Sequence, residues 1–301
     1  MKNPHMNQTF NAELYKESQI VKRKNIAFKI FLYVIMSVIA VILLTPYVVM
    51  LGKSLMTIDE IDKGMAILPS KPQFSNFITV FKTGGYGKGF LWTSAIILIN
   101  IIIVPFSATL IAYSFAKLKW FGKNVMFAVM LGTMMLPSAV TQLPLYVMYG
   151  PKYFNWLNTI MPFTIPNLFG GGAVYIFLIR QFMMGISNEM ENAAKIDGAN
   201  AFTRYTRIVL PLCKPVIIYV MVQVFIAYWG DYYGPLVYMT SSTAPKTLAL
   251  ILYNFITDNS TGAKTNVLMA GAVFMSVIPT IIFAIFQKQL IEGVQMTGLK
   301  G

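Results

Sequence analysis

The segment ENAAKIDGANAFTRYTRIVLP, residues 191–211, is a polar stretch between two long apolar runs, and the plan of the fold follows from it. It combines acidic and basic side chains with strong helix formers, whereas the chain on either side is mostly apolar. Charged side chains are costly inside a hydrocarbon layer. We therefore interpret this stretch as a helical loop that joins two membrane spans.

Composition places the chain among membrane proteins. Of its 301 residues 56% are apolar and 12% are charged, whereas about a quarter of the residues in soluble domains are charged. Strands of a β-barrel would give shorter and weaker apolar segments. Runs near the length that crosses a bilayer as helix occur six times. We predict an all-α membrane protein with six transmembrane helices, at about 25–52, 90–116, 125–148, 159–184, 216–239 and 267–286.

The basic residues predict the orientation, because positively charged loops resist translocation. If the N-terminus lies inside, the inner segments hold 16 of the 24 Lys and Arg residues. Both termini and the polar loop are then cytoplasmic. This bias also explains the net charge of +13 without a nucleic-acid partner. The expected parts are a tail (1–24), a transmembrane domain (25–291) with the polar loop (187–211) and an outer loop (240–266), and a second tail (292–301).

Catalytic and metal sites find little support in the sequence. The chain has one cysteine, Cys213, and one histidine, His5. An internal disulfide is therefore impossible, and Cys/His metal sites and paired catalytic groups have no candidates. We expect no enzyme activity, no metal and no cofactor bound by this chain.

The third and fourth predicted spans are interrupted by Pro137, Pro144, Pro162 and Pro166, and by the glycines at 170–172. Such interruptions free backbone groups, which a membrane tolerates where neighbours or a water-filled cavity satisfy them. These spans either line a transport pathway or are kinked helices that pack through small residues.

Polar residues within spans tend to face the bundle interior. Asp231 lies among aromatic rings in YWGDYYGPLVYM (228–239), a pattern that an interfacial aromatic belt explains as well as a ligand site does. Aromatic faces beside hydrogen-bonding groups suit sugar rings. The candidate pathway residues are Gln142, Asn167, Tyr228, Trp229, Asp231, Tyr232 and Tyr233.

The polar loop predicts two short helices around a turn. Ser187 or Asn188 can cap the first helix, and Gly198 supplies the left-handed conformation that ends it. A second helix is expected from about 201 to 209, bounded by Pro211.

One face of the first helix carries Met190, Ala193, Ala194 and Asp197, which are spaced i, i+3, i+4 and i+7. A helix with small side chains can slot into a groove of another protein. An interfacial helix that lies on lipid is the alternative.

This segment resembles the EAA loop of permease subunits in ATP-binding-cassette (ABC) importers. That pattern is Glu-Ala-Ala, three residues, Gly, nine residues, then Ile-x-Leu-Pro. One position departs, because Asn192 stands where the family usually has glutamate, with Glu191 just before it. The resemblance implies a coupling role toward an ATPase for Glu191, Asn192, Ala193, Ala194, Asp197, Gly198, Ile208, Leu210 and Pro211.

The likeness extends along the chain to the carbohydrate-uptake, maltose-type branch of these permeases. It is carried by LPSAVTQLPLYVMY (136–149), LNTIMPFTIP (157–166), YWGDYYGPLVYM (228–239) and GVQMTGLKG (293–301). Within that branch the chain resembles the smaller, six-span partner of a heterodimeric pair.

The resemblance implies a multi-pass protein in the cell membrane of a prokaryote. Its expected partners are a second permease, a cytoplasmic ATPase dimer that holds ATP and Mg²⁺, an extracytoplasmic binding protein and a sugar or oligosaccharide. The outer loop (240–266) would reach into the binding protein, and the tail from 287 to 301 would contact the ATPase.

Two alternatives stay open. The solute could be an amino acid, a peptide, a polyamine or glycerol phosphate. A stand-alone secondary transporter would instead need coupling charges at mid-membrane, where the spans offer little beyond Asp231 and Arg180.

Overall fold

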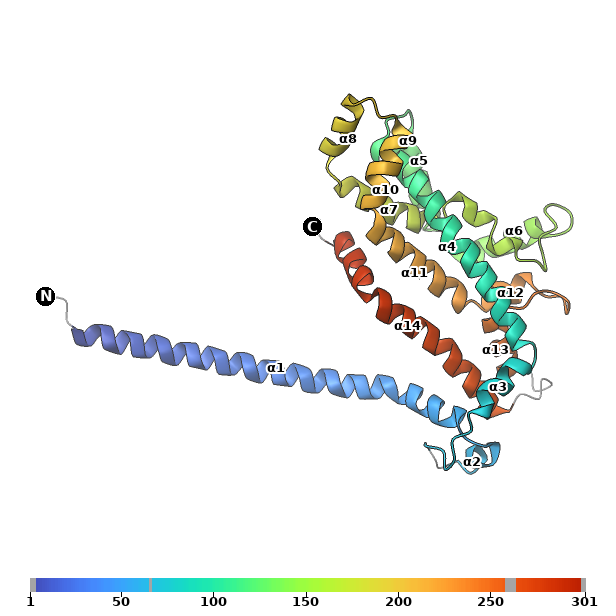
Figure 1. The fold of residues 1–301 in the computed structure, drawn as a ribbon, viewed down its shortest axis with the longest axis horizontal. Helices are drawn as coiled ribbons and strands as arrows, with labels where there is room; N and C mark the ends of the chain where they lie inside the picture. Colours follow the sequence, from blue (N-terminus) through green and yellow to red (C-terminus); the bar gives the residue numbers. More distant parts are fainter. Residues whose placement is uncertain (1–3, 65–66, 258–263, 299–301) are drawn as a thin grey trace.

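A computed structural model describes the backbone of residues 4–64, 67–257 and 264–298, and the side chains in those ranges except 4–25, 27 and 292–298. All regular elements in the described part of the chain are helical (Figure 1). The prediction of an all-α protein is confirmed.

Four stretches are long and apolar enough to cross a membrane as they stand. They are Phe28–Ser54 within α1 (Pro4–Ser54), all of α4 (Tyr86–Lys117), Met161–Gly185, and Thr265–Ile291 within α14 (Thr265–Gly298). Two further candidates are bent helix pairs, so the described chain has four to six spans. The backbone of the expected N-terminal tail is helical from Pro4 and continues directly into the first span.

The helix α4 forms the centre of the bundle and is the most buried of these four stretches. It packs against α7 (Ala173–Gly185), α11 (Lys214–Trp229) and α13 (Leu248–Thr257). Ala108 and Ala112 are fully buried on this helix, and small side chains of this kind let neighbouring backbones approach closely. The arrangement puts α4 in contact with most of the bundle.

The third predicted span, 125–148, is not one continuous helix. It consists of α5 (Lys123–Thr133) and α6 (Ser138–Tyr149), which are bent by 97°. Pro137 precedes α6 with an extended ψ of 135°, and the residue before a proline avoids the helical conformation. Pro137 therefore lies where the chain turns, whereas Pro144 lies inside α6.

The fourth predicted span, 159–184, begins with two short 3₁₀ turns, η1 (Met161–Phe163) and η2 (Pro166–Phe169), before α7 completes it. Gly171 follows with a φ of +65°. A Cβ atom on Gly171 would lie 2.5 Å from Val104 Cγ1 of α4. Glycine is therefore required here both by its dihedral angle and by the close approach to α4.

Amide side chains satisfy the open backbone of this broken span. Asn100 of α4 donates to the Phe163 carbonyl oxygen at 2.9 Å, and Asn167 donates to Asn100 Oδ1 at 2.6 Å. Asn167 also donates to the Tyr228 hydroxyl of α11. This amide cluster ties α4, the 3₁₀ turns and α11 together at a depth where water cannot replace a lost hydrogen bond.

The fifth predicted span, 216–239, ends early. The helix α11 stops at Trp229, and α12 (Tyr233–Tyr238) is separate. At its other end α11 meets the helical stretch Ala201–Leu212 at 74°. Asp231 lies between the two helices, and its Oδ1 accepts from the Gly234 N–H in the first turn of α12 at 2.9 Å.

The two ends of the bundle are built from different segments (Figure 1). One end carries α8 (Asn188–Ile196) and α9 (Ala201–Arg204), and the other carries α2 (Ile58–Asp62) and α3 (Ser75–Lys82) beside α13. The expected outer loop contains α13, an apolar helix that the sequence analysis did not predict. The Leu248 N–H of α13 donates to Thr93 Oγ1 of α4 at 2.8 Å.

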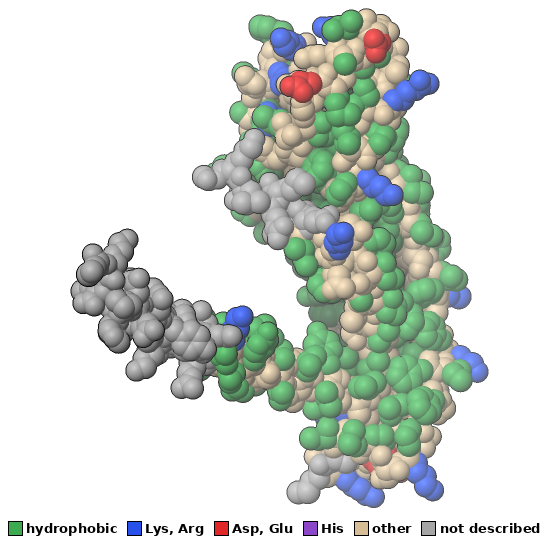
Figure 2. Space-filling view, turned by 60° about the vertical axis from the view of Figure 1, so that its left-hand side comes forward, with side chains coloured by type: hydrophobic (Ala, Val, Ile, Leu, Met, Phe, Trp, Pro, Cys, Tyr) green, Lys and Arg blue, Asp and Glu red, His purple; other side chains and the backbone are tan. Residues whose placement is uncertain are grey.

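The first span projects away from the bundle (Figure 1) and exposes apolar side chains along its length (Figure 2). None of the residues that make up its hydrophobic window is buried. It packs mainly against α14, and at its end the Ser54 carbonyl oxygen accepts from Asn76 Nδ2 of α3 at 2.9 Å.

The amide cluster predicts the effect of an isosteric change. Asn100→Leu removes the donor to Phe163 and leaves buried polar groups without partners, at a cost of about 1–3 kcal/mol. We expect a lower midpoint of thermal unfolding in detergent. The matched change Asn124→Leu, at an exposed position of α5, should leave the midpoint unchanged. Equal midpoints for both variants would show that the cluster does not hold the broken span.

Candidate functional site

The first helix of the polar loop is α8, and its ends are as predicted. Ser187 caps it, because its hydroxyl oxygen accepts from the Glu189 N–H at 3.2 Å. Gly198 follows the C-cap with a φ of +84° and donates to the Lys195 carbonyl at 3.1 Å, while Ala199 donates to the Ala194 carbonyl at 2.9 Å. These two bonds form a Schellman motif, the standard glycine-dependent helix end.

The second helix departs from its expected end. Asn200 caps α9 by accepting from the Thr203 N–H at 2.8 Å. The helix then continues through a π-helical turn, η3 (Tyr205–Val209), and α10 (Leu210–Leu212). Pro211 lies within this helical stretch, which ends at Leu212. The chain therefore bends after Pro211, at Cys213, and not at the proline.

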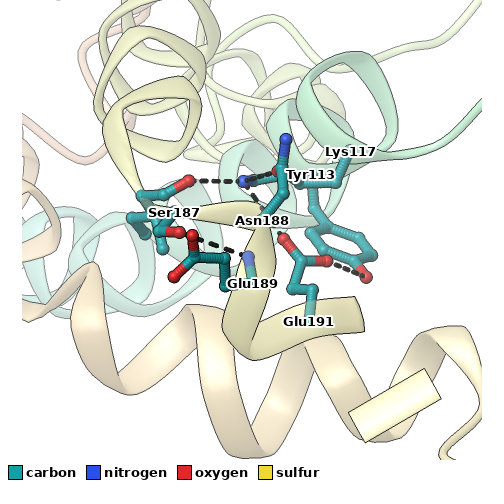
Figure 3. Close-up of polar contacts among 7 residues, drawn as sticks. Tyr113, Lys117, Ser187, Asn188, Glu189 and Glu191 are labelled. Carbon is teal, nitrogen blue, oxygen red and sulfur yellow. Dashed lines mark hydrogen bonds and ion pairs between the residues drawn. The ribbon is translucent and has the colours of Figure 1, made fainter. Parts of the chain in front are cut away.

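A buried ion pair fastens α8 to the end of α4 (Figure 3). Lys117 Nζ lies 3.1 Å from Glu191 Oε1, and their side chains are only 6% and 10% exposed. Lys117 also donates to the Ile186 carbonyl at 2.9 Å and to Asn188 Oδ1 at 2.8 Å. Tyr113, one turn earlier on α4, donates to Glu191 Oε2 at 3.3 Å. We call this set, Tyr113, Lys117, Ile186, Asn188 and Glu191, the α4–α8 anchor.

The α4–α8 anchor contains the one ion pair that forms among the described residues. Burying two charges is costly unless hydrogen bonds satisfy their remaining polar atoms. Here both charged groups have further partners on α4 or at the start of α8. The geometry therefore makes α8 and the end of α4 one mechanical unit.

A second attachment joins the following helix to α4. The Tyr205 hydroxyl and Thr109 Oγ1 of α4 are 2.9 Å apart, and the Tyr205 and Tyr113 rings lie 5.2 Å apart between centroids. Arg204 donates to the Ala199 carbonyl at 2.7 Å, which closes the turn between the two helices. Both helices of the polar loop consequently rest on α4.

The face of α8 opposite the anchor is open to solvent. Met190 is 52% exposed, Ile196 is 87% exposed, and Ala193 and Asp197 are also exposed. Ala194 is half-buried. The sequence analysis grouped Met190, Ala193, Ala194 and Asp197 on one face but missed Ile196. Its position three residues after Ala193 was the signal that could have identified it.

The remaining candidate residues of the polar loop differ in how far their side chains are buried. Glu191 is turned inward in the anchor, whereas Asn192 is exposed. Ile208 and Leu210 are half-buried, and Pro211 is exposed. The acid and the amide at 191 and 192 therefore have different surroundings, which the motif alone did not indicate.

The pathway candidates fall into two groups. Trp229 is buried and donates its indole N–H to the Met275 carbonyl of α14 at 2.8 Å. Asn167 and Tyr228 belong to the amide cluster, and Asp231 accepts from the Gly234 N–H in the first turn of α12. Trp229, Asn167 and Tyr228 therefore hold helices together within the bundle, whereas the Asp231 contact is local.

The other three pathway candidates are accessible. The Tyr233 hydroxyl donates to Gln142 Oε1 of α6 at 2.8 Å, and this contact is exposed. Tyr232 is 42% exposed and stacks on Tyr253 of α13 with centroids 4.8 Å apart. Stacked aromatic faces beside an amide and a hydroxyl form a surface that suits a polyhydroxylated ring.

Comparison with known proteins identifies relatives over most of the chain. Residues 108–295 match the family described as binding-protein-dependent transport system inner membrane component. An arabinooligosaccharides transport system permease protein of Bacillus subtilis is 28% identical over 239 residues, which is 77% of this chain and 81% of the relative. A probable ABC transporter permease protein of Pyrococcus horikoshii is 30% identical over 83% of this chain and 90% of the relative.

A solved structure shares the fold. It is a crystal structure of a bacterial ABC transporter involved in the import of the acidic polysaccharide alginate. One of its chains aligns with a TM-score of 0.75 and 21% identity, covering 88% of this chain and 97% of that chain.

The α4–α8 anchor predicts a local change when its charge is removed. Lys117→Met leaves Glu191 buried without its partner, which costs roughly 3–5 kcal/mol. We expect α8 to detach, so that its amide hydrogens exchange faster by mass spectrometry. The control Lys63→Met, at an exposed lysine that follows α2, should keep the native rate.

A charge reversal gives a second check on the same contact. Lys117→Glu alone should speed exchange in α8, and combining it with Glu191→Lys should restore part of the protection. If Lys117→Met and Lys117→Glu both leave hydrogen exchange in α8 unchanged, the α4–α8 anchor does not hold α8.

Proposed function

The chain belongs to the family of binding-protein-dependent transport system inner membrane components, and from this premise we propose that it is one of two permease subunits of a carbohydrate importer. This family consists of transport components and not of enzymes. The chain would form a translocation pathway with a second, homologous permease. A separate ATPase dimer would supply the energy, and an extracytoplasmic binding protein would deliver the solute.

The proposed topology counts each bent helix pair as one span, which gives six. The supporting observation is that the 117–123 turn and the polar loop, both rich in Lys and Arg, lie at the same end of the bundle (Figure 1). The positive-inside rule then makes that end cytoplasmic, together with both termini. The bent pairs would leave their unsatisfied backbone groups facing protein or water, as the membrane requires.

A carbohydrate solute is supported by two independent observations. The names of the relatives include transport of arabinooligosaccharides and import of alginate. The chain itself exposes Tyr232 and Tyr233 at the start of α12, and the half-buried Gln142 of α6 accepts from the Tyr233 hydroxyl. These three side chains are the pathway residues that we propose to meet the sugar.

The coupling role is proposed for the exposed face of α8. An ATPase that grips this face moves the permease only if it docks differently with the inward-open and outward-open forms. To reverse a 1:99 ratio of the two forms, the binding free energies of the ATPase for them must differ by about 5.5 kcal/mol. ATP and Mg²⁺ would be held by that partner, since this chain offers no nucleotide-binding motif.

The single observation that carries the proposal is the α4–α8 anchor. It provides the path by which a force on α8 enters the membrane, because Lys117 is the last residue of α4. From Lys117 to Thr93 the helix spans about 36 Å at 1.5 Å per residue. At that far end α4 holds α13 of the proposed outer loop. One continuous helix would therefore connect the ATPase side to the binding-protein side.

The proposal predicts the outcome of a solute screen. The complex that co-purifies with this chain, reconstituted in liposomes with its binding protein, should import an oligosaccharide only when ATP is enclosed. Amino acids, peptides, polyamines and glycerol phosphate should neither be imported nor stimulate ATP hydrolysis. ATP-dependent uptake of one of those solutes, with no response to any glycan, would refute the carbohydrate assignment.

A backbone substitution tests the turn after α8. Gly198→Val places a β-branched residue at a φ of +84°, which costs about 1–2 kcal/mol or more for a residue other than glycine. We expect an inserted protein whose uptake falls about tenfold. The space beside Gly198 is open, so steric overlap is not the cause.

The matched variant Gly198→Asn separates conformation from side-chain size, because asparagine tolerates positive φ. Uptake should remain near the native rate in this variant. If valine is tolerated as well as asparagine, the turn geometry does not matter for coupling.

A further inference from the structure

A basic cavity lies beside the α4–α8 anchor. It has a volume of about 570 Å³ and opens between the end of α4, the turn that leads to α5, and α8. Its lining includes one acidic side chain, Glu191, and five basic ones: Lys117, Lys119, Lys123, Lys195 and Arg204. The cavity therefore has a strong surplus of positive charge, which favours an anionic occupant.

The contacts within the cavity leave most of this charge uncompensated. Glu191 pairs with Lys117. Lys123 and Arg204 donate to the carbonyl groups of Leu118 and Ala199, which carry no full charge. Lys119 and Lys195 are exposed, and neither forms an ion pair with a described acidic residue. An anion in the cavity would relieve the mutual repulsion of these cations.

The surroundings of the cavity identify the kind of anion. A second hollow, of about 530 Å³, shares Lys119 and Lys123 with the first and is otherwise lined by Trp120, Phe121 and Val125 among others. Phe121 is fully exposed, and the α5 surface beyond it is apolar, with Val125 and Met126 more than half exposed. Aromatic residues in such positions mark the boundary between headgroups and hydrocarbon.

The basic pocket thus adjoins a hollow at the start of α5, beside an exposed apolar surface of that helix. We propose that this pocket binds the phosphate of an anionic phospholipid, whose acyl chains lie against Phe121 and α5. Basic pockets between helices on the cytoplasmic side of membrane proteins recognise such headgroups. An acidic segment of a partner protein would match the charge, but it would not account for the adjoining apolar hollow.

The site adjoins the anchor directly. Lys117, Asn188 and Glu191 belong both to the anchor and to the cavity lining. A bound phosphate would add a negative charge beside Lys117, Lys119 and Lys195, and so would hold α8 against α4 more firmly. A firmer contact between α8 and α4 would affect transport only if the proposed function is correct, whereas lipid binding itself does not depend on that function.

Lipid binding is tested on the full chain, purified in detergent without nucleotide or partner. Native mass spectrometry would follow the retention of added phosphatidylglycerol and phosphatidylcholine. We expect selective retention of phosphatidylglycerol. The double variant Lys119→Gln/Lys123→Gln should weaken that binding about 25-fold, since each lysine near an anionic surface contributes about a factor of five.

The matched control is Lys63→Gln/Lys71→Gln, which removes two exposed lysines at the opposite end of the bundle. It should bind phosphatidylglycerol like the native chain. A competition arm with inorganic phosphate separates a lipid site from a free-phosphate site, and millimolar phosphate should displace little lipid, because it lacks the chains that contact Phe121.

Three results would overturn the proposal. The first is equal retention of phosphatidylglycerol and phosphatidylcholine. The second is an equal loss of phosphatidylglycerol binding in the Lys119/Lys123 variant and the Lys63/Lys71 control. The third is full displacement of the lipid by inorganic phosphate. If the Lys119/Lys123 variant instead keeps its lipid but loses association with the ATPase, the pocket is a protein contact. Because no arm measures transport, failure of the lipid site would leave the proposed importer function untouched.

Discussion

The ion pair between Lys117 and Glu191 is the interaction on which the rest of the structure depends. Two charges are buried at the end of a membrane helix, an arrangement that is stable only when each has further hydrogen-bond partners. Ile186, Asn188 and Tyr113 provide those partners. Removing either charge leaves the other buried and unpaired, so the contact holds α8 in one position. A short polar helix could otherwise fray from the bundle, since nine residues are too few for an isolated helix to be stable.

The helix α4 carries this constraint across the membrane. Its end at Lys117 holds the polar loop, its middle supports the broken fourth span through Asn100, and near its other end Thr93 accepts the Leu248 N–H of α13. Each contact satisfies a polar group where water is scarce, so none can be released cheaply. The proposed lipid pocket adds to this set of contacts, because it would place an anion beside Lys117, which fastens α8.

The sequence predicted the features that depend on neighbouring residues, and it did not predict those that depend on residues far apart in the chain. The cap at Ser187 and the turn at Gly198 depend on neighbouring residues only, and both are confirmed. The inward turn of Glu191 depends on Lys117, which lies 74 positions earlier, and helical spacing carries no signal of such a partner. Trp229 and Tyr228 were grouped with exposed aromatics because composition cannot distinguish an interfacial ring from one packed between helices. The bend between α5 and α6 was visible as prolines, but its size follows from tertiary packing.

The central claim is that α8 and α4 move as one body. It is tested most directly by electron-spin-resonance distances between labels at Asn192 on α8 and Leu98 on α4, both exposed, in the assembled importer. The account predicts one narrow distance distribution that stays the same with and without ATP and broadens in the Lys117→Met protein. A distribution that shifts when ATP binds to the native complex would show that α8 moves independently of α4, and would contradict the account.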